Sequence, residues 1–345
     1  MGNITIRDIA MRANVSSTTV SRVLNNSGYV KDTTKKKILN AIKELNYVPN
    51  AVARSLSINK TNIIGVMVPD LNNPFFTEVV QGISNVADEN DLNIILCDSN
   101  ENFLEKEIKY LKMLKEQRIR GLIITPTSEE NKYNSMYLSL LEDLGIPIVL
   151  VDRDVKHSSF DGVFIDNVKG AHEGTEALIK SGHKYIAIIA GPNTSKPGRD
   201  RLVGYKKALN SYDIPIKDKY IMHGNFKLQS GYELTMKLME MEVPPTAIFS
   251  SNNLMTLGCV KALRRLNLKI PEDIALIGFD EIEIFNILDL NISVISRPTH
   301  EMGKLAMKIL LEKINKESSD DSPTKRLILS PKLLLKGSEK YNFKG

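Results

Sequence analysis

The segment 17–24 places hydroxyl groups and one guanidinium group on a single face of a predicted helix. Its apolar residues recur at the spacing of one buried helical face, and they are Val20, Val23 and Leu24. The opposite face and the first turn carry Ser17, Thr18, Ser21 and Arg22. Small hydroxyl side chains let a helix approach the edges of DNA bases, and Arg22 can bind O6 and N7 of guanine. Ser16 and Ser21 suit phosphate groups, because the N-terminus of a helix favours anions. This pattern indicates DNA binding, against the alternative of ordinary caps and surface polar residues.

Two further predicted helices would hold this one in place. Thr5 and Asp8 have the spacing of a capping box at the start of a first helix, which ends near Asn14. Ser16 can cap the second helix, and Asp32 can cap a longer third helix. Two short helices joined by a tight turn, with a third that closes the core, form the helix-turn-helix arrangement.

The charge distribution supports a polyanionic partner for this part of the chain alone. Residues 1–60 contain ten Lys and Arg against three Asp and Glu, which gives a net charge of +7. The whole chain has a net charge of +5, so the remainder carries −2. A basic head on a nearly neutral body favours nucleic acid as the partner of the head. For charge alone, a solvated basic surface remains the alternative.

Length and composition exclude several other classes of protein. The chain has 345 residues, of which 42% are hydrophobic, and this predicts two or three globular domains. No apolar run has the length of a membrane helix or a signal peptide, and the two cysteines are not spaced for zinc. We therefore expect a cytoplasmic protein without metal or cofactor. No common catalytic motif occurs, so we expect no enzyme.

A short helical segment follows the basic head. Pro49 can begin a helix and Asn50 can cap it, and apolar and basic residues continue to Leu56. A helix of about eight residues does not persist alone in water, so it would fold only against a partner.

From residue 62 onward, short apolar runs alternate with amphipathic helical patterns. The predicted strands are 63–68, 93–97, 121–125, 148–151, 162–165, 186–190, 220–223, 247–250, 274–277 and 293–296. Repeated strand–helix units predict an α/β body with parallel sheets covered by helices, and this number of strands favours two lobes around a cleft. Polar and aromatic residues follow several of these strands, where a ligand site of such a fold lies.

The head and the segment after it resemble the LacI/GalR family of bacterial transcription regulators. The matching motifs are TIRDIAMRANVSSTTVSRVLNNSGYV and KELNYVPNAVARSL. The resemblance implies a dimeric repressor of carbohydrate-utilisation genes, which binds a palindromic operator and whose short helix enters the minor groove. The DNA-binding residues that it implies are Thr5, Ser16, Ser17, Thr18, Ser21, Arg22, Asn25, Asn50, Ala53 and Leu56.

The resemblance continues through the body, which is similar to the periplasmic-binding-protein-like effector domain of this family. It implies a sugar-like effector between the lobes, in contact with Asn73, Phe75, Phe76, Asp152, Arg153, Arg201, Phe226, Asn252, Asp280 and Arg297. In that fold the chain crosses between the lobes three times, which we place near 161, 292 and 323. The predicted division is a DNA-binding head at 1–48, a hinge helix and linker at 49–61, an N-terminal lobe at 62–161 and 293–322, and a C-terminal lobe at 162–292 and 323–345.

Two departures from the family pattern concern the charge of the predicted pocket. Asn253 stands where an aspartate is common, and Arg297 stands where sugar-binding relatives often carry a neutral glutamine. Arg297, Arg153 and Arg201 together give the predicted pocket three cations, against the two carboxylates of Asp152 and Asp280. We therefore hypothesise an anionic effector, such as a sugar acid or sugar phosphate. The alternative is that Arg297 points away and pairs with Glu301.

Three alternatives stay open at this point. The effector, or a protein corepressor that nothing in the sequence indicates, could strengthen DNA binding instead of releasing it. The body alone would also fit a solute-binding protein of a sugar transporter, although the basic head argues against this. The carboxylates of Asp152 and Asp280 would allow a sugar hydrolase, but no motif marks a nucleophile.

Overall fold

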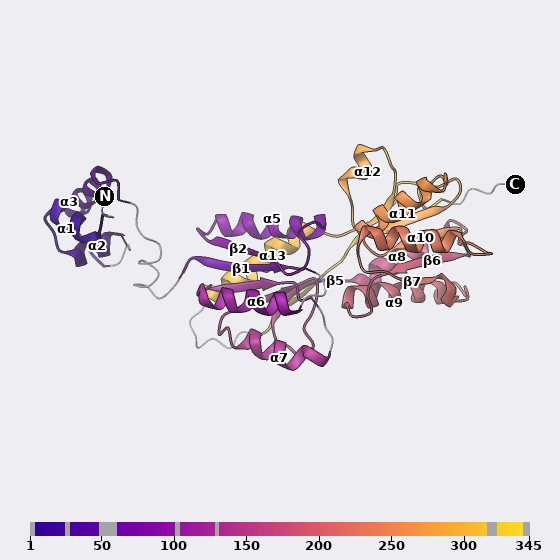
Figure 1. The fold of residues 1–345 in the computed structure, drawn as a ribbon, viewed down its shortest axis with the longest axis horizontal. Coiled ribbons are helices and arrows are strands. Elements are labelled where there is room, and N and C mark those ends of the chain that lie inside the picture. Colours follow the sequence, from indigo (N-terminus) through magenta and orange to yellow (C-terminus); the bar gives the residue numbers. More distant parts are fainter. Residues whose placement is uncertain are drawn as a thin grey trace. The chain divides into compact units, whose positions relative to one another are not determined.

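A computed structural model describes residues 4–24, 28–47, 61–100, 104–127, 131–315 and 323–340. The chain forms two units, a head at 1–61 and a body at 62–345 (Figure 1). Across the described ranges, no helix combines the length and the apolar character that crossing a membrane requires.

The head contains the three predicted helices, α1 (Ile6–Ala13), α2 (Ser17–Leu24) and α3 (Asp32–Glu44). The backbone N–H and the hydroxyl of Thr5 both donate to the Asp8 carboxylate at 2.7 Å, and Asn14 ends α1 in the left-handed conformation at φ 53°. The predicted cap of α3 is wrong by one residue. Lys31 is the N-cap and Asp32 is the first helical residue, where its carboxylate still suits the helix dipole. The core of the head is built on Ile9, Val20 and Ile38.

Two six-stranded sheets form the described part of the body. The first has the order β11 (Arg326–Leu329), β5 (Asp161–Ile165), β4 (Ile148–Val151), β3 (Gly121–Ile124), β1 (Ile63–Val68) and β2 (Asn93–Asp98), with all strands parallel. The second has the order β12 (Lys332–Leu334), β10 (Ser293–Ser296), β9 (Ala275–Phe279), β8 (Ala247–Ser250), β6 (Ile186–Ala190) and β7 (Ile221–His223). Only β12 runs antiparallel among these paired strands. All ten predicted strands are present, whereas β11 and β12 were not predicted.

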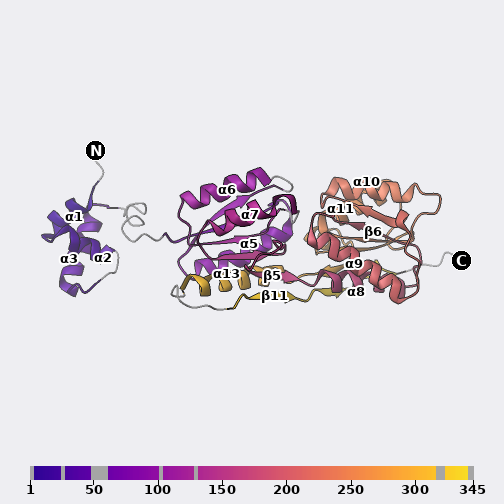
Figure 2. The ribbon, with the colours of Figure 1, turned by 90° about the horizontal axis from the view of Figure 1, so that it is seen from below.

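Helices cover both faces of each sheet, as the sequence predicts (Figures 1 and 2). Around the first sheet lie α5 (Pro74–Asp88), α6 (Leu104–Glu116), α7 (Asn131–Glu142) and α13 (Thr299–Asn315). Around the second lie α8 (Asn167–Lys180), α9 (Lys196–Ser211), α10 (Leu228–Met239), α11 (Asn253–Arg265), α12 (Glu283–Ile287) and the 3₁₀ turn η1 (Asp218–Tyr220). Each sheet with its helices is one lobe, called the N-terminal and the C-terminal lobe below.

The three crossings between the lobes lie later in the chain than predicted. β5, predicted to follow the first crossing, pairs with β4 and β11 in the N-terminal lobe. β10 was predicted to lie in the N-terminal lobe, but it pairs with β9 in the C-terminal lobe. The chain therefore crosses after β5, after β10 and between β11 and β12. Packing explains the difference, because Val163 of β5 lies in the N-terminal core and Ile295 of β10 in the C-terminal core.

Candidate DNA-binding helix and interlobe cleft

Helix α2 presents to solvent the polar residues that the sequence assigned to DNA. Ser17, Thr18 and Arg22 are exposed, Ser21 is half-buried, and Val20 on the opposite face is fully buried. This arrangement leaves a guanidinium and several hydroxyl groups available for contacts with base edges in a groove of DNA, while the apolar face packs the helix against the rest of the head.

Two predicted DNA contacts have a structural task as well. The hydroxyl of Ser16 accepts a hydrogen bond from the Thr19 N–H at 3.1 Å, so Ser16 caps α2 as predicted. Thr5 caps α1 through Asp8, and the hydrogen bonds from its hydroxyl and its N–H lower the pKa of this exposed carboxylate, against a smaller opposing effect of burial. Four predicted DNA contacts lie outside the described residues, and they are Asn25, Asn50, Ala53 and Leu56.

All ten residues predicted for the effector site line one small pocket between the two lobes. Its lining consists of Asn73, Phe75, Phe76, Asp152, Arg153, Arg201, Phe226, Asn252, Asp280 and Arg297, together with Pro197, which was not predicted. Each of the ten is at most 8% exposed, and the free volume of the pocket is about 20 Å³. The side chains therefore fill most of the space between the lobes themselves.

Local structure aims these side chains into the pocket. Asp152 directly follows β4 and Asp280 directly follows β9, and both have left-handed backbone conformations with φ of 64° and 73°. Asparagines begin the helices that follow β1 and β8. Asn73 caps α5 through the Phe75 N–H at 3.1 Å, and Asn252 caps α11 through the Met255 N–H at 3.0 Å. Twelve of the described non-glycine residues have a positive φ, and Asp152, Phe226 and Asp280 are the three of them that line the pocket.

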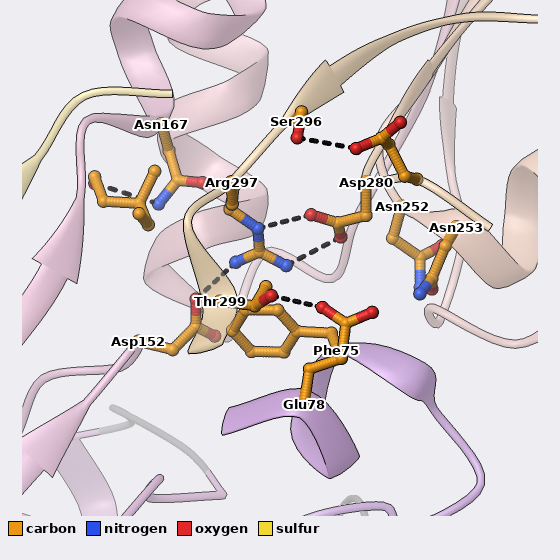
Figure 3. A network of polar contacts seen from close by, with 12 residues as sticks. Phe75, Glu78, Asp152, Asn167, Asn252, Asn253, Asp280, Ser296, Arg297 and Thr299 are labelled. Carbon is orange, nitrogen blue, oxygen red and sulfur yellow. Dashed lines mark hydrogen bonds and ion pairs between the residues drawn. The ribbon is translucent and has the colours of Figure 1, made fainter. Parts of the chain in front are cut away.

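Arg297 lies at the centre of the pocket and binds both carboxylates (Figure 3). Its Nη1 donates to Asp152 at 2.7 Å, its Nη2 donates to Asp280 at 2.7 Å, and its Nε donates to the other oxygen of Asp280. The guanidinium carbon lies 3.6 Å from the centre of the Phe75 ring. Burial alone would lower the pKa of Arg297, but the two carboxylates outweigh it and raise that pKa. The alternative that Arg297 points away towards Glu301 is wrong.

Arg201 and Arg153 flank this cluster. Arg201 donates to the side-chain oxygen of Asn167 at 2.9 Å and to the Ser251 carbonyl, and its guanidinium stacks on Phe279 at 3.9 Å. Burial, and then the charge of Arg297, lower the pKa of Arg201 to about 9. Arg153 donates to the Thr127 carbonyl at 3.1 Å.

Further polar contacts join the lobes at the rim of the pocket. The Lys227 ammonium of the C-terminal lobe donates to Asp70 of the N-terminal lobe at 2.6 Å. The amide of Asn253 donates to Asn73 at 2.8 Å across the same gap. From the sequence, Asn253 was noted only as a lost charge, and Lys227 and Asp70 were not identified. Two signals were available, because Lys227 lies next to Phe226 and Asp70 follows the strand β1.

The fold and the pocket define a class of protein, the regulators that combine a helix-turn-helix head with a two-lobed body of the kind that binds small molecules. Comparisons with known proteins agree. Residues 5–50 match the model of bacterial regulatory proteins of the lacI family, and residues 61–333 match the periplasmic binding proteins and sugar binding domain of the LacI family. This chain belongs to the LacI family of bacterial transcription regulators, and it is a DNA-binding member of that family.

Relatives match over almost the whole chain. The HTH-type transcriptional regulator RegA of Clostridium saccharobutylicum is 38% identical over 317 residues, which cover 92% of this chain and 94% of RegA. The HTH-type transcriptional repressor PurR of Proteus mirabilis is 36% identical over 318 residues, or 92% of each chain. Catabolite control protein A of Priestia megaterium is 35% identical over 321 residues, or 93% of this chain and 95% of that protein.

Two solved structures share the architecture. The Lac repressor dimer bound to operator and the anti-inducer ONPF matches with a TM-score of 0.85 and 26% identity over 99% of this chain and 100% of that one. The complex of the regulator CelR with cellobiose matches with a TM-score of 0.72 and 27% identity over 97% and 100%. These relatives are transcription regulators, not enzymes or transporter subunits, and the chain matches them through head and body alike.

Proposed function

We propose that this regulator is a dimeric repressor of carbohydrate-utilisation genes, which binds a palindromic operator and is released by a small anionic, sugar-like effector held between its lobes. One observation carries the anionic character. Three guanidinium groups and two carboxylates line a single buried pocket, which leaves this lining with an excess of one positive charge. The buried Glu107 lies outside the lining and interacts with Arg153, so the excess concerns Arg201. Buried charges need partners, so a ligand that enters this pocket should bring a negative group.

Arg201 is the best candidate to receive that group. Its hydrogen bonds described above go to neutral oxygens, and both carboxylates are bound to Arg297. The lowered pKa of Arg201 means that the pocket disfavours its charged form, although a pKa of about 9 keeps it protonated at neutral pH. A carboxylate or phosphate beside it would reverse this penalty, and planar anions suit the fork of donors on arginine.

The effector would act on DNA binding through the relative arrangement of the lobes. Each lobe contributes residues to the pocket, so a ligand that binds one arrangement better shifts the population towards it. A coupling of about 1–3 kcal/mol changes operator affinity about 5–150-fold. The proposed hinge helix at 49–56, with Leu56 as a wedge in the minor groove, would transmit this change.

A ligand screen followed by a DNA titration tests the proposal. The melting temperature of the full chain is measured with neutral sugars, with gluconate and glucuronate, and with sugar phosphates. Any stabilising compound is then added to a titration on a selected palindromic operator at fixed salt concentration. We expect an anionic compound to stabilise the wild type and to weaken operator binding, and to do neither in Arg201→Gln.

Other results would change the proposal in defined ways. Stabilisation by neutral sugars alone would contradict the anionic effector. A compound that tightens operator binding would replace release with corepression. Tight operator binding with no stabilising compound would direct the search to a protein corepressor.

A further inference from the structure

Arg297 satisfies the contacts that a bound sugar would otherwise make in this pocket. Its three donors bind Asp152 and Asp280, and its flat guanidinium covers the face of Phe75. Carboxylates that bind hydroxyl groups and an aromatic face that stacks on the ring are the usual elements of a sugar site. Here a side chain of the protein itself lies between them (Figure 3).

The same contacts join the two lobes. Asp280 and Arg297 directly follow β9 and β10 of the C-terminal lobe, whereas Asp152 and Phe75 belong to the N-terminal lobe. Separation of the lobes would keep the Arg297–Asp280 pair and break the contacts of Arg297 with Asp152 and Phe75. The broken contacts would take from Asp152 its closer guanidinium partner, Arg297 at 2.7 Å, and leave Arg153 at 4.0 Å, which opposes opening.

We propose that Arg297 is a built-in occupant of the cleft, which holds the lobes closed without a ligand and keeps neutral sugars from the two carboxylates. The Lys227–Asp70 and Asn253–Asn73 contacts at the rim also join the lobes. The free volume of about 20 Å³ is room for about one water molecule, so a sugar cannot enter without displacing Arg297. A ligand must therefore compete with Asp152 and Asp280 for the guanidinium. The closed state is independent of the proposed effector, whereas the exclusion of neutral sugars rests on the proposed sugar-like class of ligand.

Distances between spin labels on the two lobes test the closed state in the full chain. Lys115 on α6 and Lys237 on α10 are exposed, and their helices lie far from the edge of each sheet where the crossings are (Figure 2). Labels at Lys115→Cys and Lys237→Cys would report on opening. Cys97 and Cys259 are buried, and burial raises the pKa of each thiol to about 11, so both react slowly with the label.

We expect a narrow distance distribution in the protein with Arg297 and a shift to longer, broader distances in Arg297→Gln. Asp152→Asn should shift the distances in the same direction, because it removes the charge that pairs Arg297 with the N-terminal lobe and leaves the Arg297–Asp280 pair and the Phe75 contact in place. Arg265→Gln is the control, since Arg265 is an exposed arginine on α11 of the C-terminal lobe and lies outside the pocket. It should leave the distance unchanged.

The distance measurement overturns the closed state if Arg297→Gln and Asp152→Asn, both folded by circular dichroism, keep the wild-type distribution. Titration calorimetry with D-ribose and D-glucose tests the exclusion of neutral sugars separately. Binding to Arg297→Gln, without binding to the wild type, supports it. Binding of either sugar to the wild type overturns it, and so does failure of both to bind the open variant. In those cases the shift in label distance still decides whether Arg297 closes the cleft.

Discussion

The head presents its candidate contacts outward, whereas the body gathers its own into a buried pocket. Arg22 of α2 is exposed, while Arg297 in the pocket is 8% exposed and bound to two carboxylates. An exposed arginine depends little on its neighbours, so its replacement should affect DNA binding and leave the fold intact. A buried arginine and its partners form a unit, so the loss of one member changes stability, the arrangement of the lobes and ligand binding together.

The largest expected effect concerns the buried unit. Asp280→Ala should lower the free energy of unfolding of the body by about 3–5 kcal/mol, because it leaves the charge of Arg297 buried with one carboxylate instead of two. Urea unfolding followed by circular dichroism measures the change.

Asp213→Ala is the matched control for this prediction. Asp213 is exposed and has a φ of 53°, so alanine meets the same unfavourable backbone conformation there without the loss of a buried pair. Equal losses in the two variants would assign the effect to the backbone and not to the charge cluster.

A substitution in the head is expected to have a smaller effect, which concerns DNA binding alone. Arg22→Ala should cost about 1–3 kcal/mol of operator binding and relax the base preference at one position of each half-site, while the unfolding of the body stays the same. Arg12→Ala is the control, because Arg12 is also exposed but pairs with Glu44 at 2.6 Å within the head. A variant of Arg22 that kept full operator discrimination would refute its assignment to a base.

Ser16 tests whether a predicted DNA contact also supports the head itself. Because its hydroxyl accepts the Thr19 N–H, Ser16→Ala should destabilise α2 by about 1 kcal/mol. Faster hydrogen exchange of the α2 amides in the full chain would show this. Ser17→Ala, at an exposed residue of the same turn, should weaken DNA binding without faster exchange, and equal exchange in both variants would remove the capping role.

The membership of the pocket could be predicted from the sequence, but its internal pairing could not. Asp152 follows β4 of the first sheet and Asp280 follows β9 of the second, so topology places each at the carboxyl edge of its own sheet. That the two edges face each other across a cleft followed from the family resemblance. The partner of Arg297 depends on how closely the lobes approach, and Glu301 was the alternative partner that the sequence left open. The crossings were misplaced for a similar reason. The apolar runs of β5 and β10 fit either sheet, and only the packing of Val163 and Ile295 assigns them.

The smallest effect separates head from body by pH. All five histidines lie in the body, and His183 is buried there with a pKa that burial lowers. The unfolded chain, with the ordinary value of about 6.5, therefore binds the proton first as the pH falls. Stability from neutral His183 is complete above that value and is lost below it, by at most about 1 kcal/mol between pH 6.5 and 5.5.

In His183→Asn this loss should disappear from urea unfolding curves, whereas His223→Asn, at an exposed histidine of the same lobe, serves as the control. Since the head contains no histidine, its amide exchange corrected for intrinsic pH dependence should stay constant over this range, and parallel losses in both units would show that another group controls the acid response.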